Sequence, residues 1–434
     1  MAQIPRAALD YVTEQINGLS ADAQAKVLKV LQALDWKSDD ADNVAACRQA
    51  VVEALASIMP TYTDAAAQAG ADLYDAVREA SVGERLGAQS ISGYNQDAVA
   101  GAVRAFVQDI VVGDMVEGFN RKVLDRVDYE VRRAENVSVA KNAARDPLKP
   151  KYARVPSGSE TCGFCLMLSS FGFHYNSESS AGHAHANCDC RAVPDFGGAS
   201  VEGYDPDEMY RNYNRCLETL GGRDGIREQW MNLPDDEREK RIERHGGKES
   251  DAFESFLNGR IAAEIETRDA GWFRTGKAPK VDYSDNPIDS YGKVVADGDY
   301  SPENIVDRGN EWRDLYAHHV LSENGFLVKT FDGKHIDITI DGTWWDVKSP
   351  ESRGAKPRQG RELSFIENDV RKAIRQFDKR GMHDQTRIVY NPKYRHDASD
   401  AEMISELRRQ MKGHGVKEAL FITENGGIVR LKMQ

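Results

Sequence analysis

The hydrophobic pattern of the chain changes once, and this change most limits the possible folds. Over residues 5–60 apolar side chains recur at helical spacing, and the Ala-rich stretch that follows to residue 145 contains no strand pattern. Three prolines between residues 146 and 156 end this stretch because Pro cannot continue a helix. The N-terminal part is therefore expected to consist of long amphipathic helices.

Beyond residue 300, short apolar runs alternate with helical segments. We predict helices at 302–323, 366–379 and 400–412, and strands at 326–331, 335–340, 344–348, 387–390, 419–423 and 428–432. Asp341-Gly342 is typical of a two-residue hairpin turn between two of these strands. The pattern predicts a compact α/β (α+β) domain at the C-terminus.

Changes in composition and the positions of Gly and Pro divide the chain further. We expect a helical region at 1–150, a Cys/His-rich segment at 151–196, a charged helical segment at 197–274, a linker with Gly and Pro at 275–300, and the α/β domain at 301–434. From Thr275 onward Lys and Arg number 26 and Asp and Glu number 26, so the net charge of −13 lies in the first 274 residues. This acidity disfavours nucleic-acid binding by the N-terminal part.

No run of apolar residues is long enough to cross a bilayer, and the N-terminal sequence MAQIPRAALDYVTEQ lacks the features of a Sec signal peptide. We therefore expect no membrane span. Without such a signal, clustered cysteines favour a metal site over disulfides.

Four of the six cysteines lie within 29 residues. Cys162-x-x-Cys165 supplies two thiols on one turn, and His185, Cys188 and Cys190 follow at the spacing of a second pair of zinc ligands. Four ligands are needed, and one of Cys188 or Cys190 is enough, so the spacing leaves the choice between them open. The expected site is a closed, structural zinc knot.

A second candidate site lies in the predicted hairpin. Asp337 lies on one strand, and Asp346 and Lys348 share a face of the next because they are two residues apart. This is the Asp-x(8)-Asp-x-Lys spacing of PD-(D/E)XK nucleases, in which two carboxylates hold Mg²⁺ and the Lys acts on the attacking water and the phosphate. The same pattern can also occur on a solvated strand face.

Further residues could complete this site. Glu311 on the preceding helix is a candidate third acid, and Gln376 on the following helix is a candidate supporting residue. Basic side chains follow the Lys strand and suggest a surface that binds the substrate phosphates, the main candidates being Arg353, Arg358, Arg371 and Arg375.

The segments YARVPSGSETCGFCLMLSSFGFHYNS and HAHANCDCRAVPDF resemble the Cys/His region of phage minor head proteins of the Mu F-like, head-morphogenesis type. The resemblance covers roughly residues 100–196. It implies attachment near the portal inside a phage head, and such proteins carry variable C-terminal toxin domains.

The segments ENGFLVKT, HIDITIDGTWWDVKSP, IENDVRKAIRQFDKRG and TRIVYNP resemble the C-terminal tRNA-nuclease domains of contact-dependent growth inhibition (CdiA-type) toxins. Asp337, Trp345, Asp346, Lys348, Ser349 and Gln376 match their pattern. That family is commonly grouped with metal-independent ribonucleases. A metal-free mechanism would use Lys348 to stabilise the phosphorane and His318, His319 or His335 as general acid and base.

Together these features predict a multidomain protein: a mostly α-helical N-terminal part with a small Cys/His zinc knot, then a nuclease-like domain. The expected function is a phage minor capsid protein with a toxin-like, tRNA-cleaving ribonuclease domain, located in the virion and the host cytoplasm. Expected partners are portal and capsid proteins, tRNA and a cognate immunity protein. The alternatives are a Mg²⁺-dependent DNA nuclease and a purely structural head protein with an inactive C-terminal domain.

Overall fold

The structure, a computed structural model, describes residues 3–113, 115–158, 161–178, 188–198, 200–285, 312–331, 336–350, 363–395 and 398–433. Contacts between residues divide the chain into two compact units, Met1–Asp207 and Glu208–Gln434. Most of the charged helical segment therefore groups with the α/β part.

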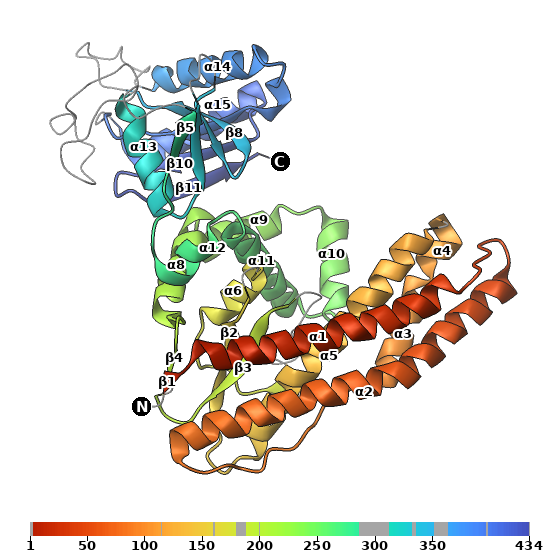
Figure 1. Ribbon diagram of the computed structural model, residues 1–434. Coiled ribbons are helices and arrows are strands. Elements are labelled where there is room, and N and C mark those ends of the chain that lie inside the picture. Colours follow the sequence, from red (N-terminus) through yellow and green to blue (C-terminus); the bar gives the residue numbers. More distant parts are fainter. Residues whose placement is uncertain are drawn as a thin grey trace. The chain divides into compact units, whose positions relative to one another are not determined.

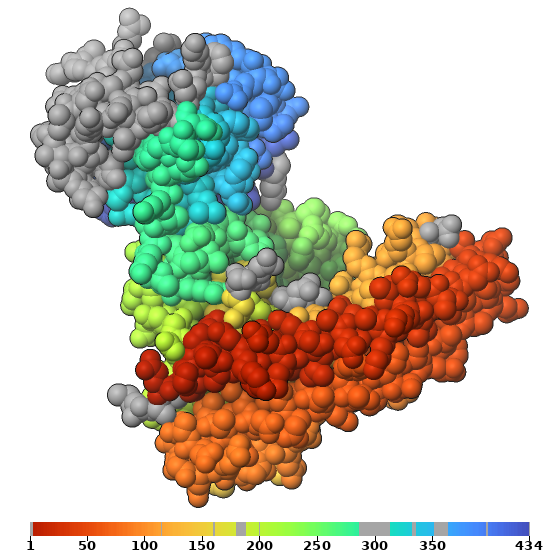
Figure 2. Space-filling model, viewed as in Figure 1, coloured from red at the N-terminus to blue at the C-terminus, as the bar shows by residue number. Residues whose placement is uncertain are grey.

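Helices dominate the first unit, as the periodicity predicts. Its elements are β1 (Gln3–Ile4), α1 (Arg6–Gln32), α2 (Ala41–Val82), α3 (Gln96–Phe106), α4 (Gln108–Gly113), α5 (Val116–Arg145), β2 (Lys151–Pro156), α6 (Gly163–Ser169), β3 (Cys190–Asp195) and β4 (Ser200–Val201). The long helices α1, α2 and α5 pack against one another (Figure 1). The side chains of α1 and α2 form one continuous surface along the unit (Figure 2).

The close approach of α2 and α5 depends on Gly70. A Cβ atom at Gly70 would lie 2.4 Å from the carbonyl oxygen of Glu135, well inside van der Waals contact. Helix α2 begins at a capped end, since the Asp40 side chain accepts hydrogen bonds from the N–H groups of Asp42 and Asn43, and it ends at Gly83 in the left-handed region. The absence of a side chain at Gly70 thus lets α5 pack closely against α2.

The Cys/His segment is held on a small antiparallel ladder. Strands β2 and β3 pair over their whole length, from Lys151 opposite Asp195 to Pro156 opposite Cys190. The short helix α6 contacts β2. Strands β1 and β4 form a separate parallel pair. The ladder brings residues from both ends of the segment together.

The second unit begins with helices. These are α8 (Pro206–Thr219), whose first two residues precede the unit boundary, α9 (Gly222–Met231), α10 (Asp235–Arg244), α11 (Glu249–Ile265) and α12 (Ala270–Thr275). Buried Glu264 of α11 forms an ion pair of 2.8 Å with Arg430 near the C-terminus. The indole N–H of Trp272 donates to the carbonyl of Glu323. These contacts join the helices to the sheet that follows.

The rest of the unit has three layers. Its elements are β5 (Asp282–Asp285), α13 (Trp312–Glu323), β6 (Val328–Phe331), β7 (Ile338–Ile340), β8 (Thr343–Lys348), α14 (Ser364–Asp378), the 3₁₀ turn η2 (His383–Gln385), β9 (Arg387–Tyr390), α15 (Asp400–His414), β10 (Glu418–Ile422) and β11 (Ile428–Lys432). The strands form one seven-stranded sheet in the order β11-β10-β9-β8-β7-β6-β5.

Strand directions in this sheet are mixed. β6, β7 and β8 form an antiparallel meander, β8, β9 and β10 are parallel, and β10 and β11 form an antiparallel hairpin. Apolar residues of α13 pack on one face of the sheet, and those of α14 and α15 pack on the other. Asp341 and Gly342 both have positive φ, 48° and 71°, as the predicted two-residue turn requires.

The predicted strands and helices of this unit are present where the structure describes them, with ends that differ by a few residues. The pattern did not predict β5, which lies in the segment expected to be a linker. Its sequence DYSD has no apolar alternation, and an edge strand needs little of it. No helix among the described residues is long and apolar enough to cross a membrane.

Candidate metal centre and candidate nuclease site

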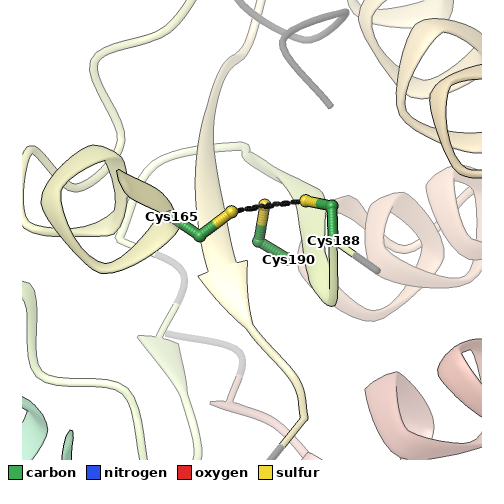
Figure 3. Close-up of side chains that lie close together, drawn as sticks. All are labelled: Cys165, Cys188 and Cys190. Atoms are coloured by element: carbon green, nitrogen blue, oxygen red, sulfur yellow. Dashed lines mark hydrogen bonds between the residues drawn. The ribbon is translucent and has the colours of Figure 1, made fainter. Parts of the chain in front are cut away.

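Three buried thiols meet between α6 and the start of β3. The Sγ atoms of Cys165, Cys188 and Cys190 lie 3.2 to 3.5 Å from one another and point to a common centre (Figure 3). Cys162 packs against this group, and its Sγ accepts a hydrogen bond from the N–H of Cys165 at the start of α6. The chain thus gathers four thiols from two segments.

The thiol group fits a tetrahedral metal ion. Zn–S bonds of about 2.3 Å imply S–S separations of roughly 3.8 Å, slightly more than those observed. Cys165, Cys188 and Cys190 are the group of three potential ligands that comes together in the described part of the chain. This buried cluster could bind a metal.

Both Cys188 and Cys190 join the cluster, which the sequence had left as alternatives. Their Sγ atoms converge on the same place and lie 3.2 Å apart (Figure 3). His185, the predicted histidine ligand, lies outside the described residues. The described residues therefore offer three clustered cysteines, with Cys162 packed beside them.

A buried arginine lies against the thiols. The Arg154 guanidinium is fully buried and donates to Cys190 Sγ at 2.7 and 3.3 Å. Burial lowers the pKa of Arg154, but the adjacent Cys190, Cys188 and Cys165 outweigh it and leave that pKa raised. A fixed cation beside the sulfurs favours thiolates, the form that binds metals.

Without a metal the thiols hold their protons tightly. The hydrogen bond with Cys165 lowers the pKa of Cys190, but the contact with Cys188 and burial raise it more, to about 12. The pKa of Cys165 is raised by its hydrogen bonds to the other three cysteines and by burial. Metal binding would therefore displace protons from the cluster.

Polar side chains of α5 hydrogen-bond to the backbone of the cysteine segment. Asn136 accepts the N–H of Ala192 and donates to the carbonyl of Cys190, and Arg132 donates to the carbonyl of Cys188. Glu135 and Arg191 form an ion pair of 3.2 Å in which both side chains are fully buried. The hydrogen bonds from Asn136 and Arg132 fix the backbone at Cys190 and Cys188.

The second site lies on the sheet face covered by α14. Asp346 is fully buried and Lys348 Nζ contacts its carboxylate. Lys348 Nζ also donates to Gln376 Oε1 on α14 at 3.1 Å. Asp337 Oδ2 accepts the backbone N–H of Val347 at 2.9 Å, which places this carboxylate beside β8. The predicted set Asp337, Asp346, Lys348 and Gln376 is therefore assembled in one place.

Burial dominates the electrostatics of this set. It raises the pKa of Asp346 well above its usual value, against the lowering effect of Lys348, and Asp337 raises it further. Burial lowers the pKa of Lys348, but Asp346 and Asp337 outweigh that effect and leave it raised. Lys348 is therefore a cation at neutral pH.

The buried Asp346 carboxylate has Lys348 as its charge partner and lies beside the carboxylate of Asp337. Two neighbouring carboxylates repel each other unless a proton or a cation lies between them. Oxygen ligands of this kind suit Mg²⁺. The donor set thus fits a divalent cation held by Asp337 and Asp346.

Two polar neighbours were not singled out from the sequence. Asp314 on α13 accepts a hydrogen bond of 2.7 Å from Ser349, directly after Lys348, and its charge raises the pKa of Lys348. Asn391 after β9 donates to Ser349 at 3.0 Å. The signal for Asp314 was its place three residues after Glu311, one helical turn away. Glu311 itself lies outside the described residues.

Of the predicted histidines, His318 and His319 are described, and neither joins this set. His318 is fully buried on α13, and burial lowers its pKa to about 3. A neutral imidazole at every physiological pH is a poor proton-transfer group. His319 Nε2 lies 2.9 Å from Glu323, its partner one turn further along the same helix. His335 lies outside the described residues.

Of the predicted substrate-binding arginines, Arg353 and Arg358 lie outside the described residues. Arg371 and Arg375 are on the exposed side of α14. Arg371 pairs with Glu367 at 2.6 Å. Their positions fit a solvated helix face as well as a binding surface.

A model of a protein family matches part of the chain. No curated protein and no solved structure matches the chain. The family-model match covers the first unit and most of α8. It supports a phage protein, because the family is one of viral gene products. Residues 3–216 are therefore similar to the family described as VG15 protein.

Proposed function

We propose that the second unit is a nuclease that hydrolyses phosphodiester bonds at Asp337, Asp346 and Lys348. One observation supports this most: a lysine and two carboxylates occupy a single buried site, with the lysine held between Asp346 and Gln376. Burying such a group costs stability unless a ligand compensates for it. Perturbed pKa values at a lysine and a carboxylate are typical of functional sites.

The residues have separate tasks in this proposal. Asp337 and Asp346 would hold a divalent cation, which supplies Lewis-acid stabilisation of the phosphoryl oxygens when bound. Lys348 orients the attacking water and stabilises the extra negative charge on phosphorus in the transition state. Gln376 accepts a hydrogen bond from Lys348 and so keeps Nζ directed at the site. Asp314 and Asn391 fix Ser349 and thereby the end of β8.

This arrangement favours metal-assisted hydrolysis over the metal-free route. The metal-free route needs a histidine that changes protonation near neutral pH. Burial lowers the pKa of His318, one of the three candidate histidines, far below that range. The resemblance to tRNA-nuclease toxins makes tRNA the proposed substrate, with DNA as the alternative. A cognate immunity protein would then protect the host cytoplasm in which the toxin acts.

For the first unit we propose a structural role in the phage head, in contact with portal and capsid proteins. The VG15 match over residues 3–216 supports this role. The thiol cluster is proposed to hold a structural zinc ion, since four cysteines leave no open position for a substrate. The unit would place the nuclease in the virion.

Expression of the full chain in bacteria tests the proposed activity. Total RNA and DNA are compared on gels after induction of the wild type, of Lys348→Ala and of Lys277→Ala, an exposed lysine outside the site. We expect RNA fragments with the wild type and with Lys277→Ala, and intact RNA with Lys348→Ala. Intact RNA and DNA with the wild type would leave the structural role as the function of the whole chain.

A further inference from the structure

A basic cleft lies in the second unit, away from the Lys348 site. Helices α9 and α11 line one side, and α15 and β11 line the other. Its volume of about 1310 Å³ exceeds the roughly 300–1,000 Å³ of small-molecule pockets. An extended, polymeric occupant suits these dimensions better than a small ligand.

Positive charge is concentrated in this cleft. Its lining includes seven Lys and Arg residues and one carboxylate, that of Glu228. From Glu208 to the C-terminus, in contrast, Lys and Arg number 38 and Asp and Glu number 41. The unit as a whole is slightly acidic, so this local excess of cations marks a surface for an anionic partner.

Three of these cations are already neutralised within the protein. Arg430 pairs with Glu264 and Glu418, Lys432 with Glu418, and Arg241 with Glu237. The other four are Arg260, Arg408, Lys412 and Lys417. In the described part of the chain, no carboxylate lies within ion-pair distance of these four cations.

Two of the four cations repel each other. Arg408 and Lys412 are exposed and four residues apart on α15, so they lie one above the other on the same helix face. Like charges at this spacing repel each other and destabilise a helix. Adjacent Arg409, in contrast, pairs with Glu406 outside the cleft. A bound polyanion would relieve the repulsion between Arg408 and Lys412.

We propose that this cleft binds the phosphate backbone of a single-stranded segment of the RNA substrate; the choice of RNA rests on the proposed nuclease function. Four cations along an open cleft match the regular charge of a nucleic-acid strand. β8 ends at Lys348, whereas Lys417 precedes β10, and these strands are parallel through β9. The cleft and the Lys348 site therefore lie toward opposite ends of the strands, so the cleft anchors RNA beyond the cleavage point.

Salt dependence of RNA binding tests this anchor. Fluorescence anisotropy of the full chain is measured with a labelled single-stranded 2′-O-methyl RNA, without added divalent cation, over a range of NaCl concentrations. Each phosphate contact contributes about −0.7 to the slope of log K against log salt for a single strand. We expect Arg408→Ala/Lys412→Ala to reduce the slope by about 1.4 and to weaken binding at low salt.

The matched control removes two exposed cations that pair outside the cleft, in Arg409→Ala/Lys240→Ala. Its slope should equal that of the wild type. Equal slopes for both double variants would refute the cleft, as would wild-type binding that polyglutamate displaces as well as RNA does. Circular dichroism checks that the variants fold, and Arg408→Lys should keep the wild-type slope.

Cleavage by the same proteins separates this inference from the proposed function. A reduced salt slope in Arg408→Ala/Lys412→Ala, with no cleavage by the wild type, would support RNA binding in the cleft and refute the nuclease function. Cleavage by the wild type with unchanged slopes would support the nuclease and refute the cleft.

Discussion

The buried ion pair beneath the cysteine segment gives a prediction whose size follows from the structure. Glu135 and Arg191 are both fully buried, and their charged groups meet at 3.2 Å. Replacing Glu135 with Leu leaves the Arg191 charge buried beside Thr13, a neutral partner. An uncompensated buried charge costs about 3–5 kcal/mol. We therefore expect Glu135→Leu to destabilise the first unit by that amount.

Replacing both partners should be far milder. Glu135 Oε1 and one Arg191 nitrogen have no hydrogen-bond partner in the described part of the chain, so the pair compensates only part of its desolvation cost. Apolar replacement of a buried ion pair is often neutral or stabilising. We expect Glu135→Leu/Arg191→Met to regain most of the stability that Glu135→Leu loses.

Native-state hydrogen exchange of α5 amides measures these changes in the stability of the first unit within the full chain. At about 1.4 kcal/mol per tenfold change, Glu135→Leu should speed exchange of the slowest α5 amides between roughly a hundred- and several-thousand-fold. The double variant should exchange close to the wild-type rate. Similar exchange in Glu135→Leu and the wild type, or a double variant worse than Glu135→Leu, would refute the reasoning.

Further predictions concern the metal, the buried histidine and a tight turn. Purified protein should carry about one zinc per chain by elemental analysis; Cys190→Ser should lose it and Cys47→Ser should keep it, whereas metal-free wild type of unchanged stability would exclude a structural zinc. Because the pKa of His318 falls from 6.5 to about 3 on folding, its stabilising contribution is complete above pH 6.5 and is lost as pH falls toward 3, at about 1.4 kcal/mol per pH unit. In urea titrations, the free energy of unfolding should fall less between pH 7 and pH 5 for His318→Leu than for the wild type. Equal decreases in the two proteins would contradict the burial argument. Gly325→Ala should lower Tm more than Gly381→Ala, since both glycines have positive φ but only a Cβ at Gly325 would lie 2.4 Å from Trp272; equal shifts would mean that the contact with Trp272 is unimportant.

Local patterns predicted the elements well, because they depend on neighbouring residues. The alternation around Asp341-Gly342 and the two-residue spacing of Asp346 and Lys348 correctly placed a hairpin and a shared strand face. Strand β5 could not be predicted in this way, since its pairing with β6 comes from the sheet rather than from its own sequence.

Long-range contacts decided what local patterns could not. The contact of Glu264 with Arg430, 166 residues away, joins the charged helices to the sheet, and no spacing rule links the two. His318 was a reasonable catalytic candidate by residue type, but its burial depends on how α13 packs on the sheet. Asp314 could be found by helical spacing only once Lys348 had been placed next to α13.

The most direct test of the central claim is cleavage of purified tRNA by the full-length protein, with and without Mg²⁺. We predict cleavage that needs the added cation and falls about a hundredfold or more in Lys348→Ala, with similar losses in Asp337→Asn and Asp346→Asn and none in His318→Leu. Cleavage that persists in EDTA and is abolished in His318→Leu would contradict the account and support the metal-free mechanism.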